Sequence, residues 1–352
     1  MSDHPVDMRD GHAIGATELL ARAAAAELCV QRGLQVTIDD FFLPEGARLD
    51  EHSRSALAEL LRALVATVES QIRRHGGDLT PEPVFARLMR SGLLHDPELM
   101  AELIGRVRQD LLGQELPAHA PDDPERPSLI NRFVEHPDRV VAASAMALLI
   151  AESRRRASPE TGHFIQTDLP AELHHRLVWW VAAALREGSD DPTAALDHAL
   201  SEAATRALAA YDEGDRLETS AMRFAVAVNP QRGELSDLLV EALGDRRIVL
   251  FIALLGHALG VDYGLAREMV LDASGDRLWL ALRALEMPRA AVAQVGYALC
   301  EADPRRDLES FAELLDAIAA IEPIQARAAL TPLRLHPDYR AALLALRRGG
   351  AR

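Results

Sequence analysis

Side chains that can bind a metal gather in one segment of the chain, Thr161–Arg176, which reads TGHFIQTDLPAELHHR. Its members of this kind are His163, Asp168, Glu172, His174 and His175. Glu172 and His175 lie three positions apart, so a helix would place both on one face, as in di-iron carboxylate bundles. Such a centre needs further glutamates from other helices. We predict no metal here, because a polar helix start that runs into an apolar helix explains the same residues.

A second candidate is a loop of small residues, Asp272–Arg277, between two predicted helices. Exposed amides in such a loop can hold an anion. A glycine that ends one helix and an aspartate that caps the next explain the same sequence, and we favour that interpretation. The residues kept as a candidate ligand loop are Asp272, Ser274, Gly275, Asp276 and Arg277.

The absence of lysine excludes several chemistries, because all 38 basic residues are arginines. A Walker A loop, a protein kinase and a pyridoxal phosphate enzyme each require a lysine. The chain also lacks a Gly-x-Ser-x-Gly elbow, a Gly-x-Gly-x-x-Gly loop and a Cys-x-x-Cys pair. We therefore expect no catalytic residue and no cofactor, and we favour a protein that is not an enzyme.

The charge of the chain argues against nucleic acid as a partner. The formal net charge is −16, which repels a phosphate backbone. Three consecutive arginines, Arg154–Arg156, form a compact basic cluster. They close a predicted helix, where cations complement the negative end of the helix dipole. We predict no nucleic-acid binding.

Cysteine usage and hydropathy predict a cytoplasmic protein without membrane insertion. Cys29 and Cys300 lie far apart in apolar stretches, which is typical of buried free thiols in a reducing compartment. The longest apolar runs, at residues 140–151 and 248–261, are shorter than the roughly 20 residues that cross a bilayer. The first twelve residues are polar and contain no signal peptide core.

Composition and periodicity predict an all-α fold. Aromatic residues are only 4% of the chain, and apolar residues recur at spacings of three and four. The expected organisation is a disordered N-terminus at 1–12, an N-terminal helical domain at 13–115, a proline-rich acidic linker at 116–127 and a C-terminal helical-repeat-like domain at 128–348. The expected helices lie at about 16–32, 50–75, 81–91, 97–114, 138–156, 170–186, 192–211, 216–228, 235–243, 248–259, 264–272, 277–286, 289–301, 308–321, 324–330 and 338–347.

Many of these helices begin with proline beside an acidic residue, as in His95–Glu98 and His136–Asp138. Proline costs nothing in a first helical turn, and an acid there favours the helix dipole. Recurrent starts of this kind, followed by alanine- and leucine-rich helices, resemble HEAT-type repeats. The spacing is irregular, so we predict a repeat-like, irregular α-solenoid array. Ile248–Leu259 is apolar almost all round and should lie at its centre.

Two segments are similar to a family of alphaproteobacterial helical proteins known only as a domain of unknown function. Phe41–Arg73 resembles its N-terminal region, and Leu238–Met287 resembles its C-terminal part. The second segment carries an L-x-x-A-L pattern from Leu239, and the tail LTPLRLHPDYRAAL also looks similar. The resemblance implies an all-helical fold. It implies no catalytic or binding residue.

Two kinds of function remain open on the sequence. The first is a helical scaffold or regulatory adaptor that binds a protein partner, since helical arrays expose long surfaces. The second is a small-ligand sensor or enzyme with a pocket between helices near His257, Asp272 and Trp279. A homodimer is a further expectation, because the helix at 50–75 carries a wide apolar stripe that a second copy would cover.

Overall fold

The structure, a computed structural model, describes residues 50–76, 84–117, 127–156, 166–189 and 193–349, together with residues 22, 26, 33, 34, 37 and 38. These residues form 16 α-helices and no strand, which confirms the all-α prediction. The predictions for residues 1–12, for most of the helix at 16–32 and for Cys29 fall outside the described residues.

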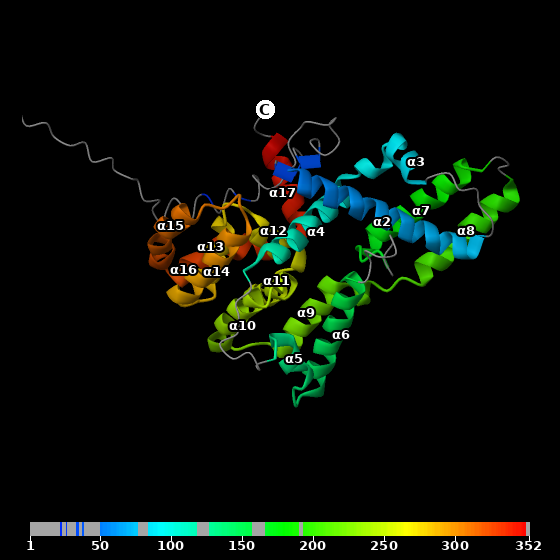
Figure 1. Cartoon of the computed structure of the whole chain (residues 1–352). Coiled ribbons are helices and arrows are strands. Elements are labelled where there is room, and N and C mark those ends of the chain that lie inside the picture. The colour runs from blue at the N-terminus through cyan, green and yellow to red at the C-terminus, as the bar shows by residue number, and fades with distance from the viewer. Residues whose placement is uncertain are drawn as a thin grey trace, which may run out of the picture.

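The helices pack around two hydrophobic cores (Figure 1). The first core is built by α2 (Glu51–Gly76), α3 (Val84–Ser91), most of α4 (Pro97–Glu115), α7 (Ala171–Glu187) and α8 (Ala194–Ala209). The second contains the end of α4 and the helices α5 (Leu129–Val134), α6 (Arg139–Arg156), α9 (Leu217–Val228), α10 (Arg232–Gly244), α11 (Ile248–Leu259), α12 (Tyr263–Leu271), α13 (Asp276–Ala284), α14 (Arg289–Ala302), α15 (Leu308–Ala320) and α16 (Pro323–Leu330). The last helix is α17 (Pro337–Gly349), and three 3₁₀ turns lie at Leu93–His95, Glu213–Asp215 and Thr331–Arg334.

The start signals that the sequence predicts act as caps in the structure. The Asp96 side chain accepts a 2.8 Å hydrogen bond from the Leu99 amide, with Pro97 in the first turn of α4. Before α6, the Asp138 carboxylate accepts a 2.8 Å bond from the Val140 amide. These bonds satisfy amides that have no partner inside their own helix. Helix boundaries therefore follow from the local sequence.

The apolar stripe of α2 is buried inside the chain. Leu61, Leu64, Val68 and Ile72 are fully buried, and α2 packs on α4, α7 and α8. The expected homodimer requires that this stripe be open to a second copy, but helices of the same chain already cover it. A homodimer stays a prediction, and it would need another surface.

Helix α11 is central, as its composition predicts. Every residue from Ile248 to Gly256 is buried, and α4, α9, α10 and α12 pack against the helix. No single helix in the described part of the chain is long and apolar enough to cross a membrane. Helices α11 and α12 are long and apolar enough only when they are taken together, and the chain bends by 116° between them.

The chain crosses from one core to the other more than once. α5 and α6 belong to the second core, α7 and α8 return to the first, and α9 enters the second again. The division into domains at 13–115 and 128–348 stays a prediction, and most of the expected linker, residues 118–126, lies outside the described residues. The two cores thus share an interface crossed by α4, by α6 and by the segment at 166–170.

Replacing Gly296 by alanine should destabilise the second core. An added Cβ at Gly296 would lie 1.9 Å from the Phe311 ring, which packs on Trp279 with ring centroids 4.8 Å apart. We expect Gly296→Ala to lower the free energy of unfolding by about 1–3 kcal/mol, because the ring must leave its packed position. Gly233→Ala is the matched control in α10, where nothing lies within 4 Å, and it should raise stability by roughly 0.5–1 kcal/mol. Urea unfolding of both variants checks the opposite signs.

Candidate functional site

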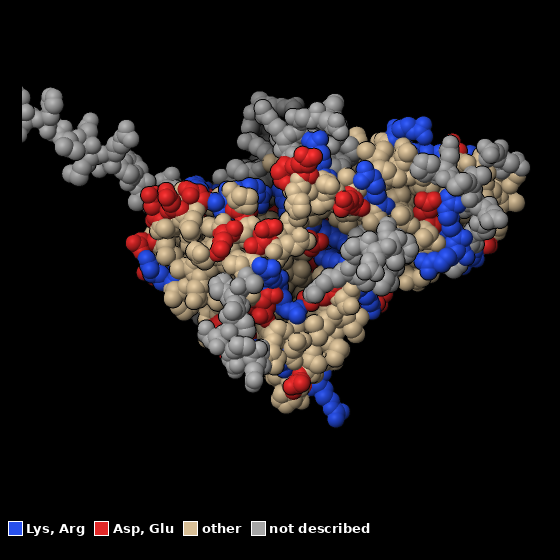
Figure 2. Space-filling model, viewed as in Figure 1, with Lys and Arg blue, Asp and Glu red and all other residues tan. Residues whose placement is uncertain are grey.

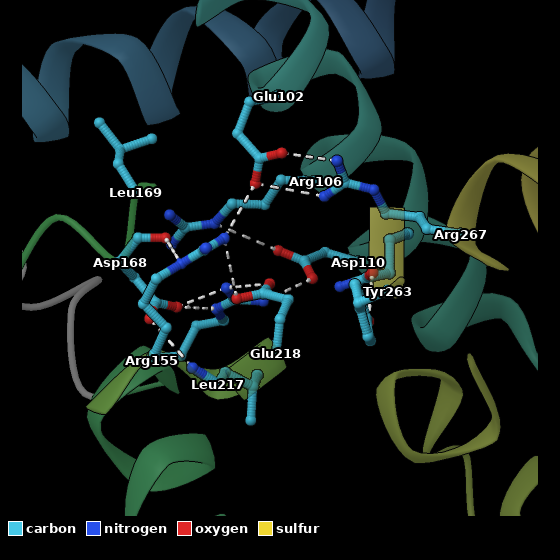
Figure 3. Close-up of polar contacts among 12 residues, drawn as sticks. Glu102, Arg106, Asp110, Arg155, Asp168, Leu169, Leu217, Glu218, Tyr263 and Arg267 are labelled. Carbon is cyan, nitrogen blue, oxygen red and sulfur yellow. Dashed lines mark hydrogen bonds and ion pairs between the residues drawn. The ribbon is translucent and has the colours of Figure 1, made fainter. Parts of the chain in front are cut away.

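A network of charged side chains lies between the two cores (Figure 3). Helix α4 contributes three members spaced one turn apart, and the other members come from α6, the segment before α7, the start of α9, and α12. The members are Glu102, Arg106, Asp110, Arg155, Asp168, Arg216, Glu218 and Arg267. The four carboxylates and four guanidiniums balance, so the interface holds charge without a net excess.

Arg155 is the centre of this network. Its Nε donates to Asp168 Oδ2 at 2.9 Å, and its Nη2 bonds both Asp168 and Glu218, the latter at 2.6 Å. Asp110 Oδ1 lies 3.7 Å from its Nη1. Burial opposes the charge on Arg155, but Glu218, Asp168 and Asp110 outweigh it and raise the pKa of the guanidinium well above its ordinary value. Arg155 is therefore held as a cation by three carboxylates from three elements.

The network holds the carboxylate of Glu218 in its ionised form. Its side chain is 4% exposed, and burial alone would raise its pKa. Arg155, Arg216 and Arg106 reverse that effect and lower the pKa of Glu218 to about 2. The carboxylate is therefore charged throughout the physiological range, and its stability contribution depends on the arginines around it.

A second ion pair joins α4 to α12. Glu102 accepts two hydrogen bonds from Arg267, at 3.2 and 2.6 Å. The pair raises the pKa of Arg267 against the opposing effect of its burial. Gly105 makes room for it, since an added Cβ there would lie 3.0 Å from the guanidinium carbon of Arg267. Bidentate geometry of this kind fixes the orientation of one helix on another.

Asp168 joins the network to the start of α9. Its Oδ1 accepts a 3.0 Å bond from the Leu217 amide, while its Oδ2 accepts from Arg155. Asp168 has a φ of 59°, a left-handed conformation that Asp tolerates better than most residues. The side chain of a distant segment thus caps α9, so this loop, α6 and α9 are held together.

One side of the network opens into a cleft of about 1200 Å³ between α2, α4, α6, α9 and the turn before α11. Arg106, Asp110 and Arg155 belong to both the network and the cleft wall. Burial among these groups raises the pKa of Asp110, although Arg155 and Arg106 oppose the shift. The charged residues that line the cleft are Glu59, Arg62, Arg106, Asp110, Glu152, Arg155, Asp245, Arg246 and Arg247. The rest of the wall is mostly apolar and comes from α2, α4, α11 and Leu217 of α9.

The predicted ligand loop lies away from this cleft, between α12 and α13. Its amides bond within the loop: Ser274 N donates to Asp272 Oδ1 at 3.2 Å, and Gly275 N donates to Asp272 O at 3.0 Å. Asp276 N lies 3.4 Å from Ser274 Oγ. Gly275 has a φ of 68°, as a turn residue would. These bonds are those of a helix-to-helix turn, and an anion site here stays a prediction.

Two charged residues of that loop, Asp276 and Arg277, are buried. Asp276 pairs with Arg22 at 3.0 Å, and burial raises the pKa of Asp276 more than Arg22 lowers it. Arg277 is 1% exposed, and its nearest carboxylate is Glu268 at 3.7 Å. Arg306 donates to the carbonyl of Asp272 at 2.7 Å. The loop is therefore held by arginines that bind its backbone and its acids.

The cleft does not lie at the position where the sequence predicts a pocket, near His257, Asp272 and Trp279. His257 is half-buried at the end of α11 and bonds the Asn229 side chain at 3.0 Å. Trp279 is 2% exposed, and Arg306 lies over its ring at 5.9 Å. Neither these two nor Asp272 lines the cleft. A pocket near these three residues stays a prediction.

The side chains of Thr161–Arg176 that could bind a metal make contacts with different parts of the protein. Asp168 joins the ion network, and Trp179 Nε1 donates to His175 Nε2 at 3.1 Å. His174 is buried, bonds the Thr167 hydroxyl at 2.9 Å, and stacks on the ring of Tyr211. Burial lowers the pKa of His174 to about 4, so the ring is neutral. His163 lies outside the described residues. Among those that are described, no three His, Cys, Asp or Glu side chains are grouped as a metal ligand set.

Sequence reasoning missed the network itself. One signal was present: Glu102, Arg106 and Asp110 recur every four residues, which places three charges on one helical face. The arginine cluster at 154–156 was explained by the helix dipole alone. In the structure Arg154 pairs with the surface residue Asp215 at 2.9 Å, while Arg155 enters the network.

Comparison with known proteins places this fold in a bacterial family. No curated protein and no solved structure matches the chain. The family described as "Uncharacterised protein conserved in bacteria (DUF2336)" matches residues 123–334, which is more than half of the chain. The matched range contains Leu238–Met287, the second segment of the sequence resemblance, but it begins after the first segment, Phe41–Arg73. It includes Arg155, Asp168, Glu218 and Arg267, whereas α4 lies outside it. The chain belongs to the bacterial family DUF2336.

Proposed function

We propose that this protein is a helical adaptor that binds an acidic segment of a protein partner in the cleft between its two cores. The observation that carries the proposal is the cleft itself, which combines apolar side chains with two arginines that form no ion pair among the described residues. Arg62 and Arg246 line it and are exposed, and neither forms an ion pair in the described part of the chain. Arg62 lies 5.5 Å from the ring of Phe85.

The size of the cleft favours a polypeptide over a small molecule. Its volume is about 1200 Å³. Pockets that enclose drug-sized ligands span roughly 300–1000 Å³ and are mostly apolar. A cleft of this size with charges on several helices suits an extended or helical segment. Apolar side chains of that segment would contact α2 and α11, and its carboxylates would meet the arginines.

The charge distribution favours an acidic partner. Arg155 and Arg247 are already paired, with Glu218 and Glu152 respectively. Arg62 and Arg246 therefore supply the available positive charge, against the acids Glu59 and Asp245 of the same wall. The whole wall holds five arginines and four acids, a near balance that contrasts with the net charge of −16 of the chain. Local charge of the opposite sign steers a charged partner into a cleft and raises its association rate.

The double variant Arg62→Glu/Arg246→Glu tests the proposal. Quantitative affinity capture from a native bacterial lysate should recover a protein with wild-type bait and lose it at least about tenfold with the variant, since two attractive charges become repulsive. The control Arg90→Glu/Arg334→Glu carries the same change of charge at two exposed residues outside the cleft.

The adaptor proposal fails if the same proteins are recovered by wild type and by the cleft variant in equal amounts. A metabolite that raises the melting temperature of wild type, and not that of the cleft variant, would instead make the cleft a ligand sensor. Circular dichroism of all three proteins checks that the helices are intact.

Two finer features belong to the same proposal. We place the helices α9–α16 in an irregular solenoid of HEAT type, supported by their short lengths and the tight turns that join them. We also place the protein in the cytoplasm. The buried free thiol of Cys300, whose pKa is raised by burial, supports a reducing compartment.

A further inference from the structure

Helix α6 exposes an apolar face that no described part of the chain covers. Its inner face, with Val141, Ala145 and Leu148, is buried in the second core. On the opposite face Val140 is 68% exposed and Ile150 is 45% exposed. Ala143 and Ala147 lie between them and are exposed as well, and Met146, 45% exposed, flanks this row. The outer face of α6 is hereafter the row Val140, Ala143, Ala147 and Ile150.

No exposed charge interrupts this face. Between Arg139 and Arg154 the only ionisable residue of α6 is Glu152, which is buried and paired with Arg247. Surface helices normally carry polar residues on the side away from the core, and a helix that is apolar all round is normally buried. In Figure 2 the corner where α5, α6 and α9 lie shows few charged side chains. The outer face therefore has the composition of an interface.

The spacing of the outer face fits a second copy of the same helix. Its residues are three, four and three positions apart, which is the spacing of a helix-packing seam. The order is large, small, small, large, and it reads the same in both directions. A two-fold axis at the middle of the helix would place Val140 beside the partner's Ile150 and Ala143 beside the partner's Ala147. Such an isologous contact requires a surface that is complementary to itself.

The charges at the two ends of α6 fit the same antiparallel arrangement. Glu135 and Asp138 are exposed just before the helix begins, and Arg139, its first residue, is exposed as well, so this end carries two acids and one arginine. Arg154 lies at the other end, bonded to Asp215 and still one-third exposed. An antiparallel partner brings the acidic end of one helix to the basic end of the other, whereas a parallel partner would bring like charges together.

We propose that this protein forms a homodimer through an antiparallel contact of two α6 helices along their outer faces. The alanines at the centre let the two backbones approach closely, and the larger residues pack at both ends. The proposal uses a different surface from the cleft, so its outcome is independent of the adaptor proposal.

Light scattering coupled to gel filtration tests the dimer. With a chain mass of 38.4 kDa, wild type should elute with twice that mass. Ile150→Glu should elute as a monomer, because two carboxylates would be buried in the contact. Ile324→Glu is the matched control, since Ile324 is 71% exposed on α16. A wild-type monomer at high concentration, or a dimer that survives Ile150→Glu, overturns the proposal.

A crosslinking experiment tests the direction of the two helices. Ala143→Cys and Ala147→Cys proteins are mixed and treated with a short bis-thiol reagent, beside wild type as the control for the native cysteines. In the antiparallel dimer the mixture should crosslink far more than either variant alone, since position 143 faces position 147. A parallel contact would crosslink each variant with itself and would contradict the proposed geometry.

Discussion

Arg155→Met should lower the free energy of unfolding by about 3–5 kcal/mol, the largest effect expected of any single substitution in the network. The guanidinium of Arg155 lies against Asp168, Glu218 and Asp110. Methionine fills much of the same volume and supplies no charge. Three carboxylates would then remain at the interface of the two cores with one less cation, and their desolvation would lack compensation.

Arg154→Met is the matched control for this prediction. Arg154 is the neighbouring residue of the same helix, and its ion pair with Asp215 is at the surface, with side chains 34% and 49% exposed. Surface pairs of this kind contribute about 0.2–1 kcal/mol, because water screens them and two long side chains must be ordered. Urea unfolding at neutral pH measures both variants. Equal losses of stability in the two would show that Arg155 has no special role in joining the cores.

The stability of the protein should fall steeply in acid because of Glu218. Its pKa is about 2 in the folded protein and 4.5 in an exposed glutamate. A lowered folded pKa means that the stabilisation is fully present above pH 4.5 and is lost as the pH falls towards 2. Linkage with these values gives a loss of about 2 kcal/mol between pH 6 and pH 3. Asp110 acts in the opposite direction, because burial raises its pKa.

Glu218→Gln separates this contribution from that of other acids. Glutamine has nearly the same shape and does not titrate, so the variant should be less stable than wild type at pH 6 and should lose about 2 kcal/mol less on the way to pH 3. Glu301→Gln, at an exposed position of α14, is the control and should keep the acid dependence of wild type. Urea unfolding at pH 6, 4.5 and 3 gives the comparison. Parallel curves for wild type and Glu218→Gln would contradict the role assigned to this carboxylate.

The individual helices follow from local sequence. Ile248–Leu259 and the helix from Pro97 were predicted within a residue or two, because apolar periodicity and capping side chains act over a few neighbouring positions. The short helix α5 was missed, since its six residues are too few for a period to show. The predicted centrality of Ile248–Leu259 is also confirmed, because a segment that is apolar all round must be enclosed.

The order in which the helices pack was decided only by the tertiary structure. Nothing in α7 or α8 indicates a return to the core of α2, because an apolar stripe fits many apolar partners. The ion network joins residues as far apart as Glu102 and Arg267, and spacing along a chain carries no signal over 165 positions. The same reason explains why the contact of Arg306 with the backbone of the loop at Asp272–Arg277 could not be predicted, since the two are distant in sequence.

The sequence by itself determined most of the helices, their approximate boundaries and the central position of α11, and its lack of lysine excludes the chemistries that need a lysine. The tertiary structure decided which apolar faces are covered and which charges meet. It buries the stripe of α2, which the sequence offered for a dimer, and leaves exposed the outer face of α6, which periodicity could not single out. The physical reason is that local propensity and capping are short-range, whereas burial and ion pairing depend on the position of every other helix.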